Sequence, residues 1–156
     1  MSADALVIGP EPPTRADVKA LLQRHLDEMH RCSPACKVNS LPAERLAELD
    51  VTFFTARKGG NLVAVGALKE LSSDTGELKS MRADDAFRGT GAGRAILRHL
   101  IGEARRRGYR WLGLETGKHE VFDPAQKLYA SEGFAECPAF ADYESDDFSM
   151  CMGMDL

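Results

Sequence analysis

The segment "FRGTGAGR", residues 87–94, most constrains the fold, because it joins a strand pattern to a helix pattern. Residues 76–83 before it have the composition of a strand. After it, apolar side chains recur at helical spacing, at Ile96, Leu97, Leu100, Ile101 and Ala104. A further strand pattern follows at residues 109–116. A strand, a helix and a strand in this order predict a βαβ crossover, and therefore a pair of parallel strands.

The rest of the chain also divides into strand and helix patterns. The other strand patterns lie at residues 6–8, 51–58, 61–69 and 148–156. The other helix patterns lie at residues 14–29, 40–49 and 124–133, with Thr14 as the predicted cap of the first. The run Gly59-Gly60-Asn61 predicts a hairpin, so residues 51–83 form three consecutive antiparallel strands. The sequence predicts one α/β domain over residues 1–156, with a central, mostly antiparallel mixed sheet and flanking helices.

Composition argues against several classes of protein. The net charge of −4 and the sequence pI of about 5.6 do not suit a general nucleic-acid binder. No apolar run reaches the roughly 20 residues that cross a bilayer, and the N-terminus lacks a signal-peptide pattern. Cys32 and Cys36 have no second Cys or His pair at the spacing of a zinc site. We expect a cytoplasmic protein with no bound metal and with neither nucleic acid nor membrane as a partner.

The glycine-rich segment predicts an anion site at a helix N-terminus. It fails the dinucleotide-binding spacing, because Arg94 and Ile96 occupy the positions that the third glycine would need. It fails the P-loop pattern too, because Arg94 and Ala95 replace the lysine and the hydroxyl residue. The segment can instead bind a pyrophosphate through successive backbone N–H groups. Gly89, Gly91 and Gly93 have no Cβ atoms that would obstruct the phosphate oxygens. A purely structural strand-to-helix turn is the alternative.

The run Arg88-Gly89-Thr90-Gly91-Ala92-Gly93 resembles the Arg/Gln-x-x-Gly-x-Gly/Ala signature of the GNAT superfamily of acyl-CoA-dependent N-acetyltransferases. The later "KLYASEGF", residues 127–134, and the order of the surrounding elements are also similar to that family. The segments "LKSMR", "LETG" and "FADY" look like a bacterial branch that acts on small molecules. The resemblance implies a GNAT-like fold, acetyl-CoA as co-substrate, and direct attack by an amine acceptor. The coenzyme contacts it implies are Met81, Ala83, Arg88, Gly89, Thr90, Gly91, Ala92, Gly93 and Arg94.

The same resemblance implies two catalytic residues. Tyr129 matches a tyrosine that lies near the coenzyme sulfur and acts as general acid. Glu77 matches a position where several members keep a glutamate as general base, able to relay a proton through water. The alternative candidates for the general base are Glu70 and Glu115, which also lie near strand ends. The departures from the family pattern are Asp85, where a proline is common, and Phe122, where many members hold the pantetheine arm with an asparagine.

His25 and Arg82 are the candidate contacts for the acceptor. His25 shares a helical face with Leu21 and Met29, which suits either a substrate contact or a packed core histidine. Arg82 can meet a substrate carboxylate, or pair with Glu70 or Glu115. The last loop could attract a cationic amine, or stay solvated, through Asp142, Glu144, Asp146 and Asp147. Two other functions remain as alternatives, a non-catalytic acyl-CoA-binding module and a nucleotide-binding α/β protein. A homodimer is also an open possibility for the oligomeric state.

Overall fold

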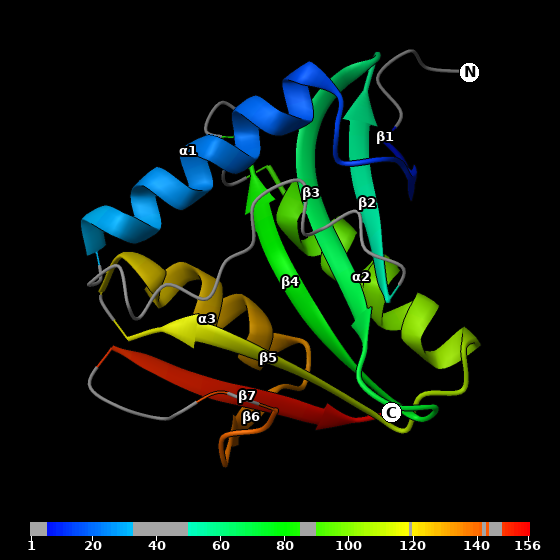
Figure 1. Ribbon diagram of the computed structural model, residues 1–156, viewed down its shortest axis with the longest axis vertical. Helices are drawn as coiled ribbons and strands as arrows, with labels where there is room; N and C mark the ends of the chain where they lie inside the picture. The colour runs from blue at the N-terminus through cyan, green and yellow to red at the C-terminus, as the bar shows by residue number, and fades with distance from the viewer. Residues whose placement is uncertain (1–5, 33–49, 85–89, 119, 142, 144–147) are drawn as a thin grey trace.

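The computed structural model describes residues 6–32, 50–84, 90–118, 120–141, 143 and 148–156. Within these residues the chain forms a seven-stranded sheet in the order β1-β2-β3-β4-β5-β7-β6 (Figure 1). The strands are β1 Leu6–Pro10, β2 Val51–Lys58, β3 Asn61–Glu70, β4 Thr75–Ala83, β5 Trp111–Gly117, β6 Ala135–Cys137 and β7 Ser149–Asp155. The helices are α1 Ala16–Cys32, α2 Ala92–Arg106, the short η4 Glu120–Phe122 and α3 Asp123–Ser131.

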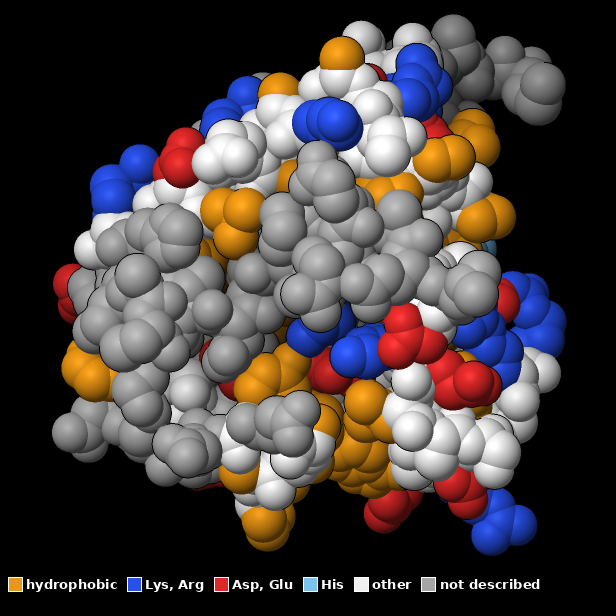
Figure 2. Space-filling view, in the orientation of Figure 1, with side chains coloured by type: hydrophobic (Ala, Val, Ile, Leu, Met, Phe, Trp, Pro, Cys, Tyr) orange, Lys and Arg blue, Asp and Glu red, His pale blue; other side chains and the backbone are white. Residues whose placement is uncertain are grey.

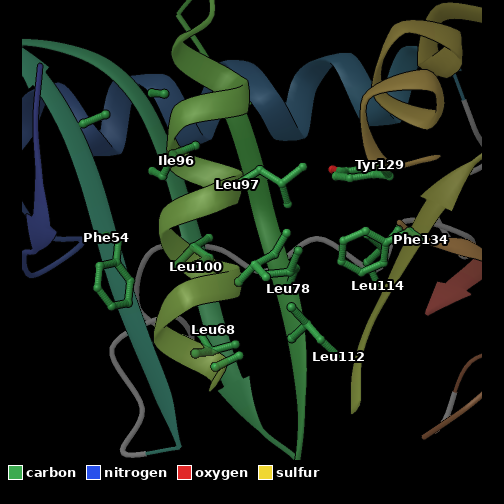
Figure 3. Close-up of a cluster of buried hydrophobic side chains, with 14 of the residues drawn as sticks. Phe54, Leu68, Leu78, Ile96, Leu97, Leu100, Leu112, Leu114, Tyr129 and Phe134 are labelled. Carbon is green, nitrogen blue, oxygen red and sulfur yellow. The ribbon is translucent and has the colours of Figure 1, made fainter. Parts of the chain in front are cut away.

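Helices α1 and α2 cover opposite faces of the sheet, and apolar burial holds each in place. Successive residues of a strand point to opposite faces, so Phe53 of β2 packs with α1 and Phe54 packs on the side of α2. On the α1 face, the helix contributes Val18, Leu21 and Leu22. The larger cluster lies on the α2 face and also includes side chains of α3 and β5 (Figure 3).

Strands β4 and β5 are parallel for only a short distance and then diverge (Figure 1). The ladder joins Thr75, Gly76 and Glu77 to Trp111, Leu112 and Gly113. This pair is connected through α2, which confirms the predicted βαβ crossover, while the other strand pairs of the sheet are antiparallel. Beyond Glu77, β4 continues to Ala83 with ladder partners only in β3 among the described residues. A wedge therefore opens in the middle of the sheet.

A β-bulge in β4 determines which side chains face this wedge. Val65 pairs with Arg82, whereas Ala67 pairs with Lys79, so β4 has one extra residue opposite β3. Ser80, inside the bulge, has a φ of 54°, in the left-handed region. The extra residue reverses the alternation, and Met81 packs against the α2-side core while Arg82 binds Glu28 of α1 at 2.5 Å.

Most predicted elements are confirmed, with local differences. The first helix begins at Ala16 rather than after Thr14, because the carbonyl of Arg15 accepts the first helical bond, from the N–H of Lys19. The prediction of Thr14 as the cap is therefore wrong. The three-residue strand β6 and the single turn η4 are too short to give a sequence pattern. The predicted helix at residues 40–49 lies outside the described residues.

The face that carries α1 has a mixed charge distribution. Lys and Arg side chains lie among Asp and Glu side chains across the described part of this face (Figure 2).

In the portion of the chain that is described, no helix has both the length and the apolar character needed to cross a membrane.

We expect Gly113→Ala to destabilise the protein. A Cβ atom at Gly113 would lie closer than 3.0 Å to the rings of Trp111 and Phe140, both too close for a real contact. Overpacking of this kind costs about 1–3 kcal/mol. The matched control is Gly102→Ala on α2, where a Cβ meets nothing within 4 Å and alanine should stabilise the helix slightly. Urea unfolding checks both, and equal stability of Gly113→Ala and wild type would contradict the packing argument.

Candidate active site

A cavity of about 100 Å³ occupies the wedge between β4 and β5. Its lining comes from five elements and from two residues that precede β7 in the chain. The residues are His25, Met29, Glu77, Leu78, Lys79, Ser80, Met81, Leu114, Glu115, Thr116, Gly117, Phe122, Ala125, Tyr129, Tyr143 and Phe148. The fold thus gathers carboxylates, a lysine, a histidine and two tyrosines around one small space.

Glu77, Lys79 and Tyr143 form a hydrogen-bonded cluster at the cavity. Lys79 Nζ donates to Glu77 Oε2 at 3.1 Å and to the hydroxyl of Tyr143 at 2.5 Å. The hydroxyl of Tyr143 in turn donates to the same Oε2 atom. The side chains of Glu77 and Lys79 are only 3% and 9% exposed, so this is a buried ion pair. One carboxylate oxygen of Glu77 thus accepts from both an ammonium and a phenol hydroxyl.

A stack of aromatic rings supports Tyr143. Its ring meets Phe140 edge to face at 5.4 Å, and Phe140 meets Trp111 in the same way at 5.0 Å. The backbone N–H of Phe140 also bonds to the sulfur of Cys151, which attaches this segment to β7. Burial, with the negative charge of Glu77, raises the pKa of Tyr143 above its ordinary value, so the hydroxyl remains a proton donor to the carboxylate.

Tyr129 lies on the side of the cavity formed by α3. The residue is 8% exposed, and its ring packs edge to face on Phe134 at 5.9 Å. Its hydroxyl points away from α3 towards the side of Leu97 (Figure 3). Burial, with a smaller contribution from the charge of Glu115, raises the pKa of Tyr129 to about 12. The phenol therefore keeps its proton throughout the neutral range.

The N-terminus of α2 fits the predicted anion site. Gly91 is the N-cap residue with a φ of 90°, a conformation that favours glycine, and a Cβ there would meet nothing within 4 Å. Among the described residues no side chain caps this end, and its first turn holds no acidic residue. The first helical bond belongs to the N–H of Ala95, so the preceding backbone donors have no partner within the helix. Arg94 bonds to Ser131 at 3.0 Å and pairs with Glu132 at 3.4 Å, which joins α2 to α3.

The structure brings some of the predicted residues together and places others elsewhere. His25 points inward and lines the cavity with Glu77, Met81 and Tyr129, and so does the rival carboxylate Glu115. Glu70 lies at the far end of β3 and accepts a hydrogen bond from Tyr109 at 3.4 Å. Arg82 forms an ion pair, as one alternative predicted, but with Glu28 rather than Glu70 or Glu115. Ala83 pairs with Ala64 at the end of β4.

Several predicted contacts lie outside the described residues. These are Arg88 and Gly89 of the loop, Asp85, and the acidic residues Asp142, Glu144, Asp146 and Asp147. Among the residues that are described, no cluster of three or more His, Cys, Asp or Glu side chains could hold a metal ion. Phe122, at the position of the expected asparagine, packs its ring against the backbone of Gly117.

Lys79 and Tyr143 are site residues that the sequence patterns did not predict. Lys79 could have been found, because it lies two residues after Glu77 on one strand and therefore shares its face. Tyr143 carries no such signal, since it lies 66 residues away and reaches Glu77 only in the folded chain.

Comparison with known proteins identifies the family. Residues 19–134 match the model of the acetyltransferase (GNAT) family. The chain belongs to the GNAT family of acetyltransferases. It is 42% identical over 139 residues to the uncharacterised N-acetyltransferase YsnE of Bacillus subtilis, which covers 89% of this chain and 92% of that protein. The chain is accordingly an N-acetyltransferase, and GNAT enzymes use acetyl-CoA.

Solved GNAT structures share the fold described above. A protein from Klebsiella pneumoniae assigned as an acyl-CoA N-acyltransferase superposes with a TM-score of 0.78 at 30% identity, with 99% of each chain covered. A GNAT acetyltransferase from Elizabethkingia anophelis with acetyl-CoA bound superposes with a TM-score of 0.69 at 16% identity, over 98% of this chain and 99% of that one. The predicted mixed, mostly antiparallel GNAT fold is confirmed.

Proposed function

We propose that this GNAT enzyme transfers the acetyl group of acetyl-CoA to the amine of a small molecule in the wedge between β4 and β5. The observation that carries the proposal is that Glu77 and Tyr129, from elements far apart in sequence, line one cavity. One is a buried carboxylate that pairs with Lys79, and the other is a phenol that keeps its proton. An acyl transfer to an amine needs this pair, because one proton must be accepted and another donated.

The coenzyme would lie along β4 with its pyrophosphate at the N-terminus of α2. The backbone donors there that have no partner within the helix attract an anion, and the positive end of the helix dipole adds to them. The edge of β4 that faces β5 has no ladder partner beyond Glu77 among the described residues. The pantetheine arm can therefore pair with Met81 and Ala83 as an added strand. Thr90, Ala92, Gly93 and Arg94 would surround the phosphates.

The chemical step needs no covalent enzyme intermediate. The lone pair of the amine attacks the thioester carbon, the C–N bond forms, and the C–S bond breaks. Glu77 accepts the proton that the amine loses, directly or through one water. Tyr129 donates a hydrogen bond to the sulfur as negative charge develops there, and the sulfur leaves as a thiolate. A phenol with a pKa of about 12 is a weaker acid than an ordinary thiol, so Tyr129 keeps its proton. The thiolate takes up a proton from solvent, and Glu77 releases to solvent the proton that it accepted from the amine.

A screen of amines tests this function. The protein, acetyl-CoA and a mixed panel of small amines are incubated, and acetylated products are detected by mass together with the released thiol. We expect one class of amine to gain an acetyl group with one equivalent of thiol released. Tight acetyl-CoA binding with no product from any amine would instead favour the acyl-CoA-binding module.

We expect Glu77→Gln to lower kcat/KM most at acidic pH. There the amine is mostly protonated, and its deprotonation depends most on a base; at alkaline pH the free amine no longer needs one. The loss should be about 10²-fold or more near pH 6 and should shrink as pH rises. Because the amide leaves Lys79 without its anion, the double variant Glu77→Gln/Lys79→Met is the control for folding. A single variant with the wild-type pH profile would move the role to Glu115 or to water.

A further inference from the structure

We propose that the acceptor is an α-amino acid or a close analogue, whose amine binds to Glu77 and whose carboxylate binds to Lys79. This inference rests on the acetyl transfer proposed above and names the substrate class of the same cavity. The buried ion pair presents one negative and one positive group side by side to the space where the acceptor must lie.

Both members of the pair keep capacity for a ligand. The hydrogen bonds of Glu77 with other described residues all end on Oε2, which leaves Oε1 as an acceptor. Lys79 has three N–H donors, and its hydrogen bonds with described residues use two of them. The hydroxyl of Tyr143 is already committed, since it donates to Glu77 and accepts from Lys79. With respect to the described residues, an acceptor therefore finds one carboxylate oxygen and one ammonium hydrogen that make no hydrogen bond.

The chemistry of an α-amino acid complements this arrangement. Its amine and carboxylate are attached to one carbon, so its opposite charges lie as close together as those of Glu77 and Lys79, whose charged atoms are 3.1 Å apart. Two antiparallel ion pairs leave no charge unpaired in the cavity, whereas a simple ammonium would add a positive charge that the Glu77–Lys79 pair does not offset. The amine then lies against the proposed base, and the carboxylate is held away from the thioester.

Ser80 adds an independent observation. Its residue is 9% exposed, it lines the cavity, and its hydroxyl has no hydrogen-bond partner within the described chain. Buried hydroxyl groups are normally satisfied, so a ligand atom is expected there. The hydroxyl can donate to the acceptor carboxylate beside Lys79. The rest of the lining offers apolar contact for an amino-acid side chain from Met29, Phe122 and Phe148.

A matched set of acceptors tests the inference. Steady-state kcat/KM is measured for several L-amino acids, for their carboxamides, and for the corresponding amines that lack the carboxylate. In solution the carboxamide is the weaker base and has more neutral amine near pH 8, so intrinsic reactivity favours it. We nevertheless expect the wild-type enzyme to prefer the carboxylate by about 10- to 100-fold, the range of one hydrogen bond to a charged group.

Lys79→Met should reduce this preference to one or below, because the positive charge that favours a carboxylate over a carboxamide is removed and the intrinsic reactivity then decides. The control variant Lys58→Met removes an exposed lysine at the end of β2, far from the cavity lining, and should keep the wild-type preference. Equal kcat/KM for carboxylates and carboxamides in the wild type would overturn the inference while the acetyl transfer stands. A preference that persists in folded Lys79→Met would also overturn it. No product from any acceptor would overturn the proposed function itself.

Discussion

Tyr129→Phe should lower kcat by about 10²-fold while the affinity for acetyl-CoA changes little. The substitution removes only the hydroxyl, and the ring keeps its packing on Phe134. The lost hydrogen bond strengthens mainly as charge develops on the sulfur, so its loss raises the energy of the transition state more than that of the bound ground state. General acid catalysis contributes about 10²–10⁴-fold, and a thiolate with a thiol pKa near 8.5 leaves easily enough to favour the lower end. Steady-state kinetics and calorimetric binding of acetyl-CoA separate the two effects.

The raised pKa of Tyr129 gives this prediction an internal control. Because the pKa is about 12 in the folded protein against an ordinary 10.0, the phenol still donates at pH 9–10, and wild-type kcat should not fall there through its ionisation. The same shift stabilises the folded state below pH 10.0, and this contribution is lost as pH rises towards 12. Tyr129→Phe should therefore lose less unfolding free energy than wild type over that interval. Wild-type turnover in this variant would reduce Tyr129 to a packing residue.

Gly91→Val should weaken acetyl-CoA binding by about 10- to 100-fold, the range expected for losing one hydrogen bond to a charged group. At a φ of 90° a branched side chain strains the backbone at the start of α2, where the pyrophosphate is proposed to lie. The backbone donors of the first turn would then be displaced or blocked. Isothermal calorimetry with acetyl-CoA measures the effect.

Two further glycine variants separate the effect of backbone strain from the effect of side-chain bulk at the proposed pyrophosphate site. Gly91→Ala keeps the positive φ penalty without the branched methyl groups, so it should weaken binding less than Gly91→Val. Gly93→Ala places its Cβ 3.8 Å from Leu128, an ordinary contact, and should leave the fold intact. If coenzyme affinity is the same in Gly91→Val and wild type, the glycine-rich segment is only a turn between strand and helix.

The sequence by itself determined most of the elements and their order, with β6 and η4 as the exceptions. Helical spacing located α2, the Gly-Gly-Asn run located the hairpin, and a strand on each side of α2 required a parallel pair. It also located Tyr129 and Glu77 through motif resemblance. These signals are local, since the periods of 3.6 and 2 and the φ preference of glycine act over a few residues. The helix predicted at residues 40–49 and the part of the anion site predicted at residues 85–89 stay predictions, because they lie outside the described residues.

Only the tertiary structure decided what surrounds the proposed catalytic groups. The hydroxyl of Tyr143 reaches Glu77 across 66 residues, and the ring of Tyr143 is supported by edge-to-face contacts from Phe140, which in turn contacts Trp111. No local sequence pattern encodes these contacts. Arg82 binds Glu28 across 54 residues because the bulge at Ser80 turns it towards α1. The divergence of β4 and β5 after three ladder pairs opens the cavity. Such features arise from packing between distant segments, which a periodicity along the chain does not encode.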